Sequence, residues 1–317
     1  MRTDTKNRIQ VPERGRIRQR LFIAFALLGW FLASFSAYGS ENREVTVSHP
    51  DGNINWTHGW IEASGTAVAP GVYPDSAKAR NKAVQNARVA ARNNLLQILG
   101  SIDLDSNKTV GRLLNEKPDI RAKLIAMIDG LQAPEPPKVE SGGSAVIRLR
   151  MEFQGPFSKL ILPEDIKQIE PIKRVSPKKT ETASTAKISK ETKQADGASA
   201  QKPSVHSGMI VDAKGLSGVK PALVPKIVDE TGREIYGPAF VSREYAIQSG
   251  MVSYMKDIGP ARKSVRVKPN PLIVKGLKTK NLGRSIIVVS NADASKLRHA
   301  SENLSFLKQC RVIILLD

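Results

Sequence analysis

The residues that could do chemistry are scattered along this sequence. Its four histidines show neither the His-x-x-x-His spacing nor the Cys and His pairing of metal sites. They are His49, His58, His206 and His299. Asp293 and His299 fall on one predicted helix, but a separation of six residues puts them on roughly opposite faces. The sequence therefore predicts neither a metal site nor a cofactor.

Catalytic motifs are also missing from the sequence. It has no Gly-x-Ser-x-Gly turn and no Walker loop, and the short run 215–218 predicts only a loop. Asp103 and Asp105 raise the hypothesis of a catalytic carboxylate pair, although two acids beside a turn are usually only solvated. Cys310, the single cysteine, opens an apolar run and is predicted to be a small buried side chain. We expect a protein that is not an enzyme.

One group of like charges could bind an anionic partner. It lies on the exposed face of a predicted helix and consists of Lys78, Lys82, Arg88 and Arg92. No acidic residue occurs from 76 to 102, and like charges four apart on a helix repel by about 0.2–0.5 kcal/mol. The alternatives are a binding face for an anionic surface and a solvated face of a basic protein. Val89 and Leu96 lie among these cations, which predicts that a later segment covers part of the face.

A strand and a long helix position that face. Residues 61–67 alternate between apolar and polar side chains, which predicts a half-buried strand. After a proline-containing break, an alanine-rich helix is predicted to begin at Asp75 as its N-cap. Its buried face recurs at spacings of three and four: Val84, Ala87, Ala91, Leu95 and Ile98. Since alanines allow close backbone approach, we expect this helix to pack on a sheet made with the preceding strand.

The first folded domain is predicted to span residues 41–163. Pro118 can occupy the first turn of a further helix that ends near Gly130. A tight turn is predicted at 141–143, and the regular alternation of 145–153 predicts a strand with one face in the core. Antiparallel strands packed on one side by helices fit this order of elements, so the expected class is α+β.

Part of this domain resembles a known family. The pattern Gly-Trp-Ile-x-Ala-x-Gly-x-Ala at 59–67, a proline-containing break and Ala-x-Ala-Arg-x-Lys-Ala at 77–83 resemble the LPP-twenty lipoprotein family. The resemblance covers about a third of the chain and is carried by Gly59, Trp60, Gly65, Ala67, Ala79, Arg80, Lys82, Ala83, Ala87, Leu95 and Ile98. The family includes a flagellar outer-membrane lipoprotein, and a similar domain begins a flagellar H-ring protein. The resemblance implies an exported, non-enzymatic envelope protein, although this chain lacks the family's lipid-bearing cysteine.

The first 39 residues predict an export signal. Seven basic and two acidic residues precede an uninterrupted apolar run at 21–32, and Ala37-Tyr38-Gly39 forms an acceptable cleavage site before Ser40. No adjacent arginine pair precedes Leu21, so the general secretion route is expected. The alternative is an uncleaved inner-membrane anchor, for which residues 21–37 fall short of the roughly 20 residues that span a bilayer.

The net charge and the aromatic content limit the classes of partner that we expect. The formal net charge is +19, and loss of the signal would leave the chain strongly basic. An exported basic protein meets anionic lipid head groups, lipopolysaccharide and wall polymers. Aromatic residues make up only 5% of the chain and do not interleave with basic ones, so nucleic acid is not an expected partner. One cysteine excludes an internal disulfide, and self-association stays open.

A linker and a second domain are predicted to follow. In residues 164–205, Lys, Ser, Thr and Ala replace the apolar periodicity, which predicts a disordered linker with a reach of about 35 Å. We therefore expect the two domains to be tethered at a distance.

Residues 206–317 predict a second α+β domain. Expected elements are a strand at 209–213, a hairpin around 229–232, a helix at 242–250 and an edge strand at 272–274 framed by prolines. Two apolar runs, 286–289 and 312–316, are joined by a helix that Ser290 and Asp293 cap in a variant capping box. This arrangement predicts a βαβ crossover with both strands buried.

The sequence thus predicts an α+β fold of two small domains, each a mainly antiparallel sheet packed with helices, joined by a disordered linker. The favoured function is an exported structural or assembly component in the periplasm or at the outer membrane, with other envelope or flagellar basal-structure proteins as partners. The alternative is a binding module for lipopolysaccharide or wall glycan that uses Lys78, Lys82, Arg88 and Arg92.

Overall fold

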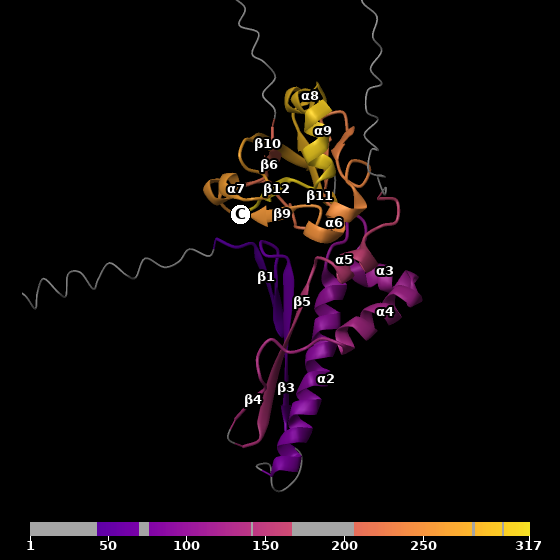
Figure 1. Ribbon diagram of the computed structural model, residues 1–317, viewed down its shortest axis with the longest axis vertical. Coiled ribbons are helices and arrows are strands. Elements are labelled where there is room, and N and C mark those ends of the chain that lie inside the picture. The colour runs from indigo at the N-terminus through magenta and orange to yellow at the C-terminus, as the bar shows by residue number, and fades with distance from the viewer. Residues whose placement is uncertain (1–42, 70–75, 141, 167–205, 281–282, 300) are drawn as a thin grey trace, which may run out of the picture. The chain divides into compact units, whose positions relative to one another are not determined.

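The computed structural model describes residues 43–69, 76–140, 142–166, 206–280, 283–299 and 301–317 (Figure 1). They fall in one compact unit that extends from Arg43 to Asp317. This unit contains an antiparallel sheet and a mixed sheet, both packed with helices. The predicted α+β class with two sheet-bearing regions is confirmed.

The first sheet is antiparallel throughout its described strands. In spatial order these are β1 (Thr46–His49), β2 (Gly52–Asn55), β3 (Trp60–Val68), β5 (Ser144–Glu152) and β4 (Lys138–Val139). The two long strands, β3 and β5, pair over their whole length, from Trp60 opposite Glu152 to Val68 opposite Ser144. Both contain a predicted alternating run, and Ile61 and Leu149 show the inward face fully buried.

Helix α2 (Ala77–Ser101) covers one face of this sheet (Figure 1). Its buried residues are Ala79, Ala83, Ala87, Ala91, Leu95, Ile98 and Leu99, whereas Val84 is only half-buried. The helix lies so close to β3 that a Cβ at Gly65 would lie 2.1 Å from the backbone N of Ala91 and 2.2 Å from the O of Ala87. The predicted packing of an alanine-rich helix on the sheet is confirmed.

The start of α2 differs by one residue from the predicted cap. Ser76 is the N-cap, and its Oγ accepts a hydrogen bond from Ala79 N at 3.3 Å. Asp75 lies outside the described residues. A serine at this position satisfies one of the free amides of the first helical turn.

Three shorter helices complete the first region. They are α3 (Val110–Glu116), α4 (Pro118–Asp129) and α5 (Pro156–Ile161). As predicted, α4 has Pro118 in its first turn, ends at Gly130 and buries Leu124 and Ile128. Between α2 and α3, Asp103 forms an isolated β-bridge with Thr109.

The second sheet is mixed. In spatial order its described strands are β8 (Glu234–Tyr236), β7 (Lys226–Asp229), β11 (Gly283–Val289), β10 (Pro271–Lys280), β6 (Gly208–Asp212), β12 (Val312–Leu315) and β9 (Ser253–Met255). Four of its pairings are parallel and two are antiparallel, so strand directions differ from the mainly antiparallel expectation. Continuous apolar strands such as β12 are buried on both faces, as parallel strands usually are.

Two sequence predictions for this sheet are wrong. β10 is an interior strand between β11 and β6, and Pro271 is tolerated because it occupies only the first strand position. The expected βαβ crossover is not parallel: β11 runs antiparallel to β10, and β10 and β12 both run parallel to β6. Burial on both faces made the two strands apolar, and that signal does not encode direction.

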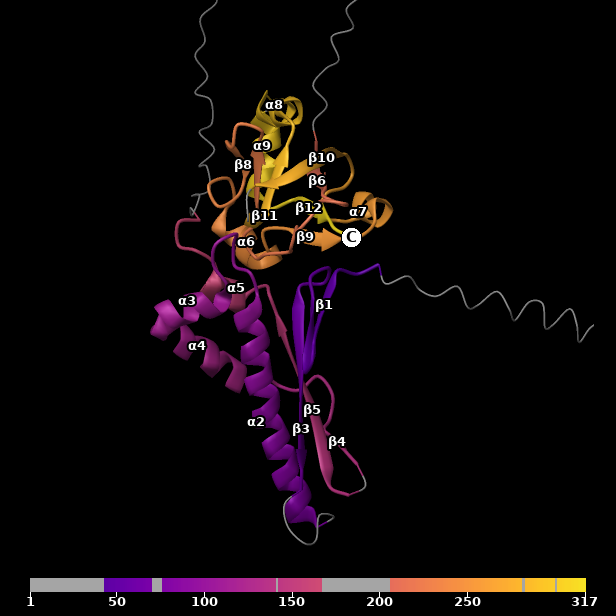
Figure 2. The same ribbon diagram turned by 180° about the vertical axis from the view of Figure 1, so that it is seen from behind.

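Helices cover the two faces of the second sheet unequally. α6 (Arg243–Ser249), α8 (Asn291–His299) and α9 (Ser301–Lys308) lie on one side, and α7 (Ile258–Lys263) lies on the other (Figure 2). α8 and α9 both fall on the single helix predicted between β11 and β12, and residue 300 between them lies outside the described part. The predicted capping box is confirmed, since Ser290 Oγ accepts from Asp293 N at 3.0 Å and donates to Asp293 Oδ2 at 2.9 Å.

The described parts of the two regions share one hydrophobic core, whereas the sequence predicted two domains tethered at a distance. Backbone hydrogen bonds cross between them from Leu223 N to Asp103 O (3.0 Å), Val224 N to Leu104 O (2.7 Å) and Gly155 N to Ile247 O (2.8 Å). Apolar side chains exposed at the end of each sheet leave water by packing together. The predicted linker, from residue 167 onward, and the predicted export signal lie outside the described residues.

Candidate functional site

The predicted cationic face lies on the side of α2 that points away from the sheet. Lys78 and Lys82 are exposed, and Arg88 and Arg92 are half-buried. None of the first three has a carboxylate within ion-pair distance among the described residues. Their ammonium and guanidinium groups are therefore available to an anionic partner.

Arg92 differs from the other three because it has a partner at the end of α4. Its Nη1 lies 3.2 Å from Asp129 Oδ1, and its Nη2 donates to Asp129 O at 2.5 Å. Leu96 is half-buried against the core, which confirms that a later segment covers part of this face, while Val89 stays 54% exposed. The free cationic face is thus the N-terminal half of α2.

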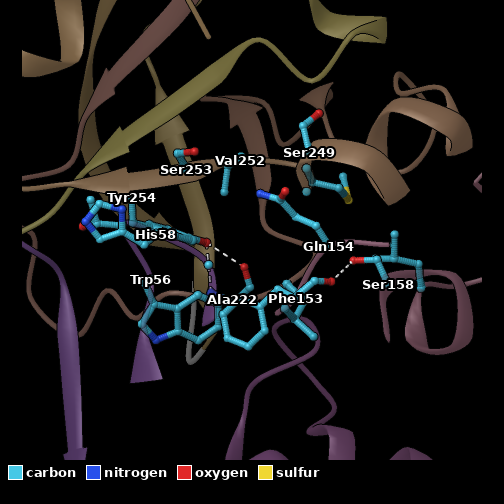
Figure 3. Close-up of a pocket in the computed structure, with 16 residues that line it drawn as sticks. Trp56, His58, Phe153, Gln154, Ser158, Ala222, Ser249, Val252, Ser253 and Tyr254 are labelled. Atoms are coloured by element: carbon cyan, nitrogen blue, oxygen red, sulfur yellow. Dashed lines mark hydrogen bonds between the residues drawn. The ribbon is translucent and has the colours of Figure 1, made fainter. Parts of the chain in front are cut away.

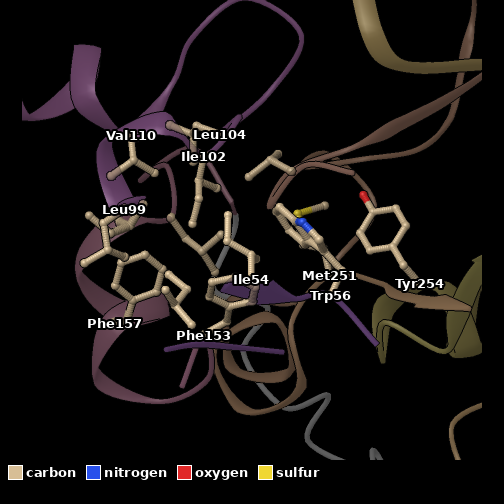
Figure 4. Packing of buried hydrophobic residues seen from close by; sticks show 14 of the residues in the cluster. Ile54, Trp56, Leu99, Ile102, Leu104, Val110, Phe153, Phe157, Met251 and Tyr254 are labelled. Atoms are coloured by element: carbon tan, nitrogen blue, oxygen red, sulfur yellow. The ribbon is translucent and has the colours of Figure 1, made fainter. Parts of the chain in front are cut away.

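A second feature, which the sequence did not predict, is the junction between the two sheets. Trp56, directly after β2, packs against Phe153 with the two rings tilted and their centroids 5.1 Å apart, and it meets Tyr254 of β9 edge-on at 5.5 Å (Figure 4). The Tyr254 hydroxyl accepts from Ala222 N at 2.9 Å and donates to Ala222 O at 2.8 Å. Burial raises the pKa of Tyr254, so this hydroxyl stays protonated.

A small cavity of about 40 Å³ opens beside this junction (Figure 3). Its wall combines the aromatic residues with the polar side chains of His58, Gln154 and Ser249. Since one water needs roughly 10–15 Å³ of such space, the cavity has room for about three waters. It is too small for a substrate of ordinary size.

A larger groove of about 440 Å³ lies where α3, α4 and α5 meet the start of α6. Its lining combines apolar residues with both cations and acids, including Lys117, Lys159 and Asp165. Arg243 of α6 also lines it and donates to the carbonyl oxygens of Lys159 (3.1 Å) and Pro163 (2.5 Å). The volume would suit a ligand, but the mixed charges select no ligand class.

Cys310 is fully buried, as predicted, and burial raises its pKa to about 11. Beside it, the Arg266 guanidinium donates to the carbonyl oxygens of Cys310 (2.5 Å), Gly250 (3.3 Å) and Ser249. Desolvation lowers the pKa of Arg266, and Tyr236 OH donates to Met251 O nearby. A protonated, buried thiol is a poor nucleophile, so Cys310 is not placed for catalysis. The hydrogen bonds of Arg266 instead hold the end of α6 to the turn before β12.

The other candidates for chemistry are not brought together. Asp105 Oδ1 accepts from the backbone N of Asn107 and Lys108 in a local turn, while burial raises the pKa of Asp103. His58 Nε2 lies 3.0 Å from Glu44 Oε1. Within the described ranges, no three His, Cys, Asp or Glu side chains are grouped as metal ligands would be. The side chain of His299 lies outside the described part.

One buried carboxylate is held firmly at the end of β7. Asp229 Oδ1 accepts from Thr231 Oγ1 (2.5 Å), Thr231 N (3.0 Å) and Arg233 N (2.9 Å). Its Oδ2 accepts from Arg298 Nη2 at 2.7 Å and Arg233 Nε at 3.3 Å. These hydrogen bonds, led by that from Thr231, hold the pKa of Asp229 well below its usual range. With its lone pairs occupied, the carboxylate fixes the β7–β8 turn to α8.

Among the described residues, no helix is both long enough and apolar enough to cross a bilayer.

Comparison with known protein families matches the second region. Residues 208–317, about a third of the chain, match the family model described as the second domain of Treponema pallidum Tp0624. These bounds run from the start of β6 to the end of the chain and enclose the whole mixed sheet. No curated protein matches the sequence. The second region is thus similar to a domain of Tp0624.

Proposed function

We propose that this chain is an exported, non-enzymatic structural component of the cell envelope, placed in the periplasm or at the outer membrane. The observation that supports it best is the junction between the two sheets. A scaffold has to hold its contact surfaces at a fixed separation. Three interregion backbone hydrogen bonds, a shared core and the Arg243 contacts provide that rigidity here.

Two features of the sequence support an envelope location. The arginine-rich leader with its apolar run suggests export, and residues 59–98 resemble the LPP-twenty family of envelope lipoproteins. The resemblance makes a flagellar basal structure the first place to look, with its component proteins as partners.

Co-sedimentation tests this proposal. The chain is expected to sediment with purified outer membrane, wall sacculi or flagellar basal bodies. The preparation with which it sediments identifies the structure that contains its partner. Arg243→Ala, which removes the contacts to Lys159 and Pro163, should weaken sedimentation because the two regions no longer keep their arrangement. Arg121→Ala, an exposed change on α4, is the matched control. A chain that stays in the supernatant with all three preparations would refute the proposal.

A second candidate function is binding of lipopolysaccharide or wall glycan. It is favoured by the free cations on α2, since Lys78, Lys82 and Arg88 have no carboxylate partner in the described part of the chain. An anionic polymer would relieve their mutual repulsion.

Charge reversal separates this candidate from the first. Lys82→Glu with Arg88→Glu should abolish binding to lipopolysaccharide or sacculi and leave assembly with envelope proteins intact. Lys138→Glu with Lys214→Glu makes the same change in net charge at exposed positions elsewhere. Equal loss in both double variants would show that binding follows total charge and would reject a specific α2 face.

A further inference from the structure

The face of the second sheet that carries α7 differs from the face that carries α8 and α9. Ala261 of α7 and Val267 just after it are fully buried against Ile210, Ile313 and Leu315. In both views α7 stands across the sheet from α8 and α9 (Figures 1 and 2). We call the surface formed by residues 258–268 and the adjoining part of β10 the α7 face.

Apolar side chains point outward from this face. Val265 is 78% exposed, more than any other large hydrophobic residue described, and Ile258 is 40% exposed. The segment alternates, so Val265 faces out while Val267, two residues later, is completely buried. Val265 is therefore held in solvent by a neighbour that anchors the backbone, and exposed apolar groups of this kind commonly mark contact sites.

Cations surround these apolar side chains. Arg262, Lys263 and Lys268 are all exposed, and none has a carboxylate within ion-pair distance among the described residues. The acid in this segment, Asp257, lies 3.8 Å from Arg43 Nε and is thus already paired. The segment offers free positive charge next to exposed apolar surface.

Strand β10 also has exposed lysines next to an exposed apolar side chain. Lys275 follows Ile273 by two residues and shares its side of the strand, and Lys278 lies opposite Val288 of β11. A register shift between Gly276 and Lys278 marks a bulge at Leu277, which is 46% exposed. Leu277 lies between Lys275 and Lys278 in the sequence, and all three side chains are exposed. Asp212, opposite Lys275, accepts from Lys214 N at 3.3 Å.

We infer that the α7 face docks on the surface of an anionic phospholipid bilayer. Lysine and arginine next to a bilayer attract anionic head groups, and apolar side chains between them enter the boundary of the acyl region. A purely anionic polymer would use the cations but leave Ile258, Val265 and Leu277 in water. The inference specifies the surface used in the proposed envelope role, and it rests on that role because it requires the chain to reach a bilayer.

A site-specific probe tests this inference in the full chain. Cys310 is buried and its thiol is protonated, so a cysteine placed at Val265 is the one that a polarity-sensitive fluorophore labels. Labelled Val265→Cys should show a blue-shifted emission with vesicles of phosphatidylglycerol and phosphatidylcholine, and no shift with phosphatidylcholine alone. Because the readout is local, insertion of the predicted leader into the same vesicles does not produce it.

Two further variants make the test specific. Val139→Cys, labelled at an exposed position of β4 away from both the α7 face and the α2 cations, is the matched control and should show no shift. Adding Arg262→Gln and Lys263→Gln to the Val265→Cys chain should weaken vesicle binding about thirtyfold, since each cation contributes about fivefold. No shift at 265, or a shift at 139 alone, would overturn the inference. Neither result bears on export, which cell fractionation tests separately.

Discussion

Tyr254 shows at the residue scale how the segment that crosses to the first region at Leu223 and Val224 is held in place. Its hydroxyl satisfies both backbone groups of Ala222 inside the core, so Tyr254→Phe would leave a buried N–H and C=O without a partner. We expect a loss of about 1–3 kcal/mol in the free energy of unfolding. Urea denaturation measures it, with Tyr245→Phe as the control because Tyr245 is 41% exposed. Equal stability of the two variants would contradict this role.

The low pKa of the Asp229 carboxylate makes the stability of the fold depend on pH. Its folded-state pKa is depressed, so its contribution to stability is complete above the unfolded pKa near 3.9 and is lost as pH falls. Asp229→Asn should lower stability at neutral pH and flatten its fall between about pH 4 and pH 2. Denaturation at several pH values measures this slope. An unchanged acid slope in Asp229→Asn would show that other carboxylates, such as Glu44, dominate.

At this scale the sequence predicted local features and missed distant ones. The cap at Ser290, the burial of Cys310 and most of the inward face of α2 follow from residues a few positions apart. The pairing of Arg92 with Asp129 and of Asp229 with Arg298 joins residues far apart in the chain. No spacing rule connects such pairs, so only the folded arrangement shows them.

At the scale of elements, the contact between α2 and β3 depends on Gly65. A Cβ there would overlap the helix backbone at Ala87 and Ala91, so Gly65→Ala should destabilise the fold by about 1–3 kcal/mol or more. Gly100→Ala is the matched control, because its Cβ would meet nothing nearer than 3.7 Å and it lies inside a helix. That variant should be stabilised by about 0.5–1 kcal/mol. Thermal unfolding of the pair decides between these outcomes.

The sequence identified most elements but not their order in the second sheet. Alternation in β3 and β5 and the periodicity of α2 are strong local signals, and the first region was predicted accordingly. In β10, the nearby prolines suggested an edge, yet Pro271 is only the first residue of a ten-residue interior strand. The α7 face was missed because the run Val-Arg-Val at 265–267 does not say which valine points inward.

At the scale of the whole molecule, the shared core predicts cooperative unfolding. Trp60 in β3 reports on the first region and Trp56 on the junction, while far-UV circular dichroism reports on both regions. Because the core is continuous across the junction, the two probes should give coincident transitions in denaturant. Separate midpoints would contradict a rigid unit and favour two independent domains. The sequence could not predict this continuity, since Trp56, Ala222 and Tyr254 are brought together only by the fold.

The envelope role itself is tested most directly by the N-terminal mass of the chain in fractionated cells. The account predicts a product that begins near Ser40 and is recovered with the periplasmic or outer-membrane fraction. Full-length protein in the membrane fraction would be consistent with the envelope role but would show that the leader is an uncleaved inner-membrane anchor. Full-length protein in the cytosolic fraction, with its arginine-rich leader intact, would contradict the account.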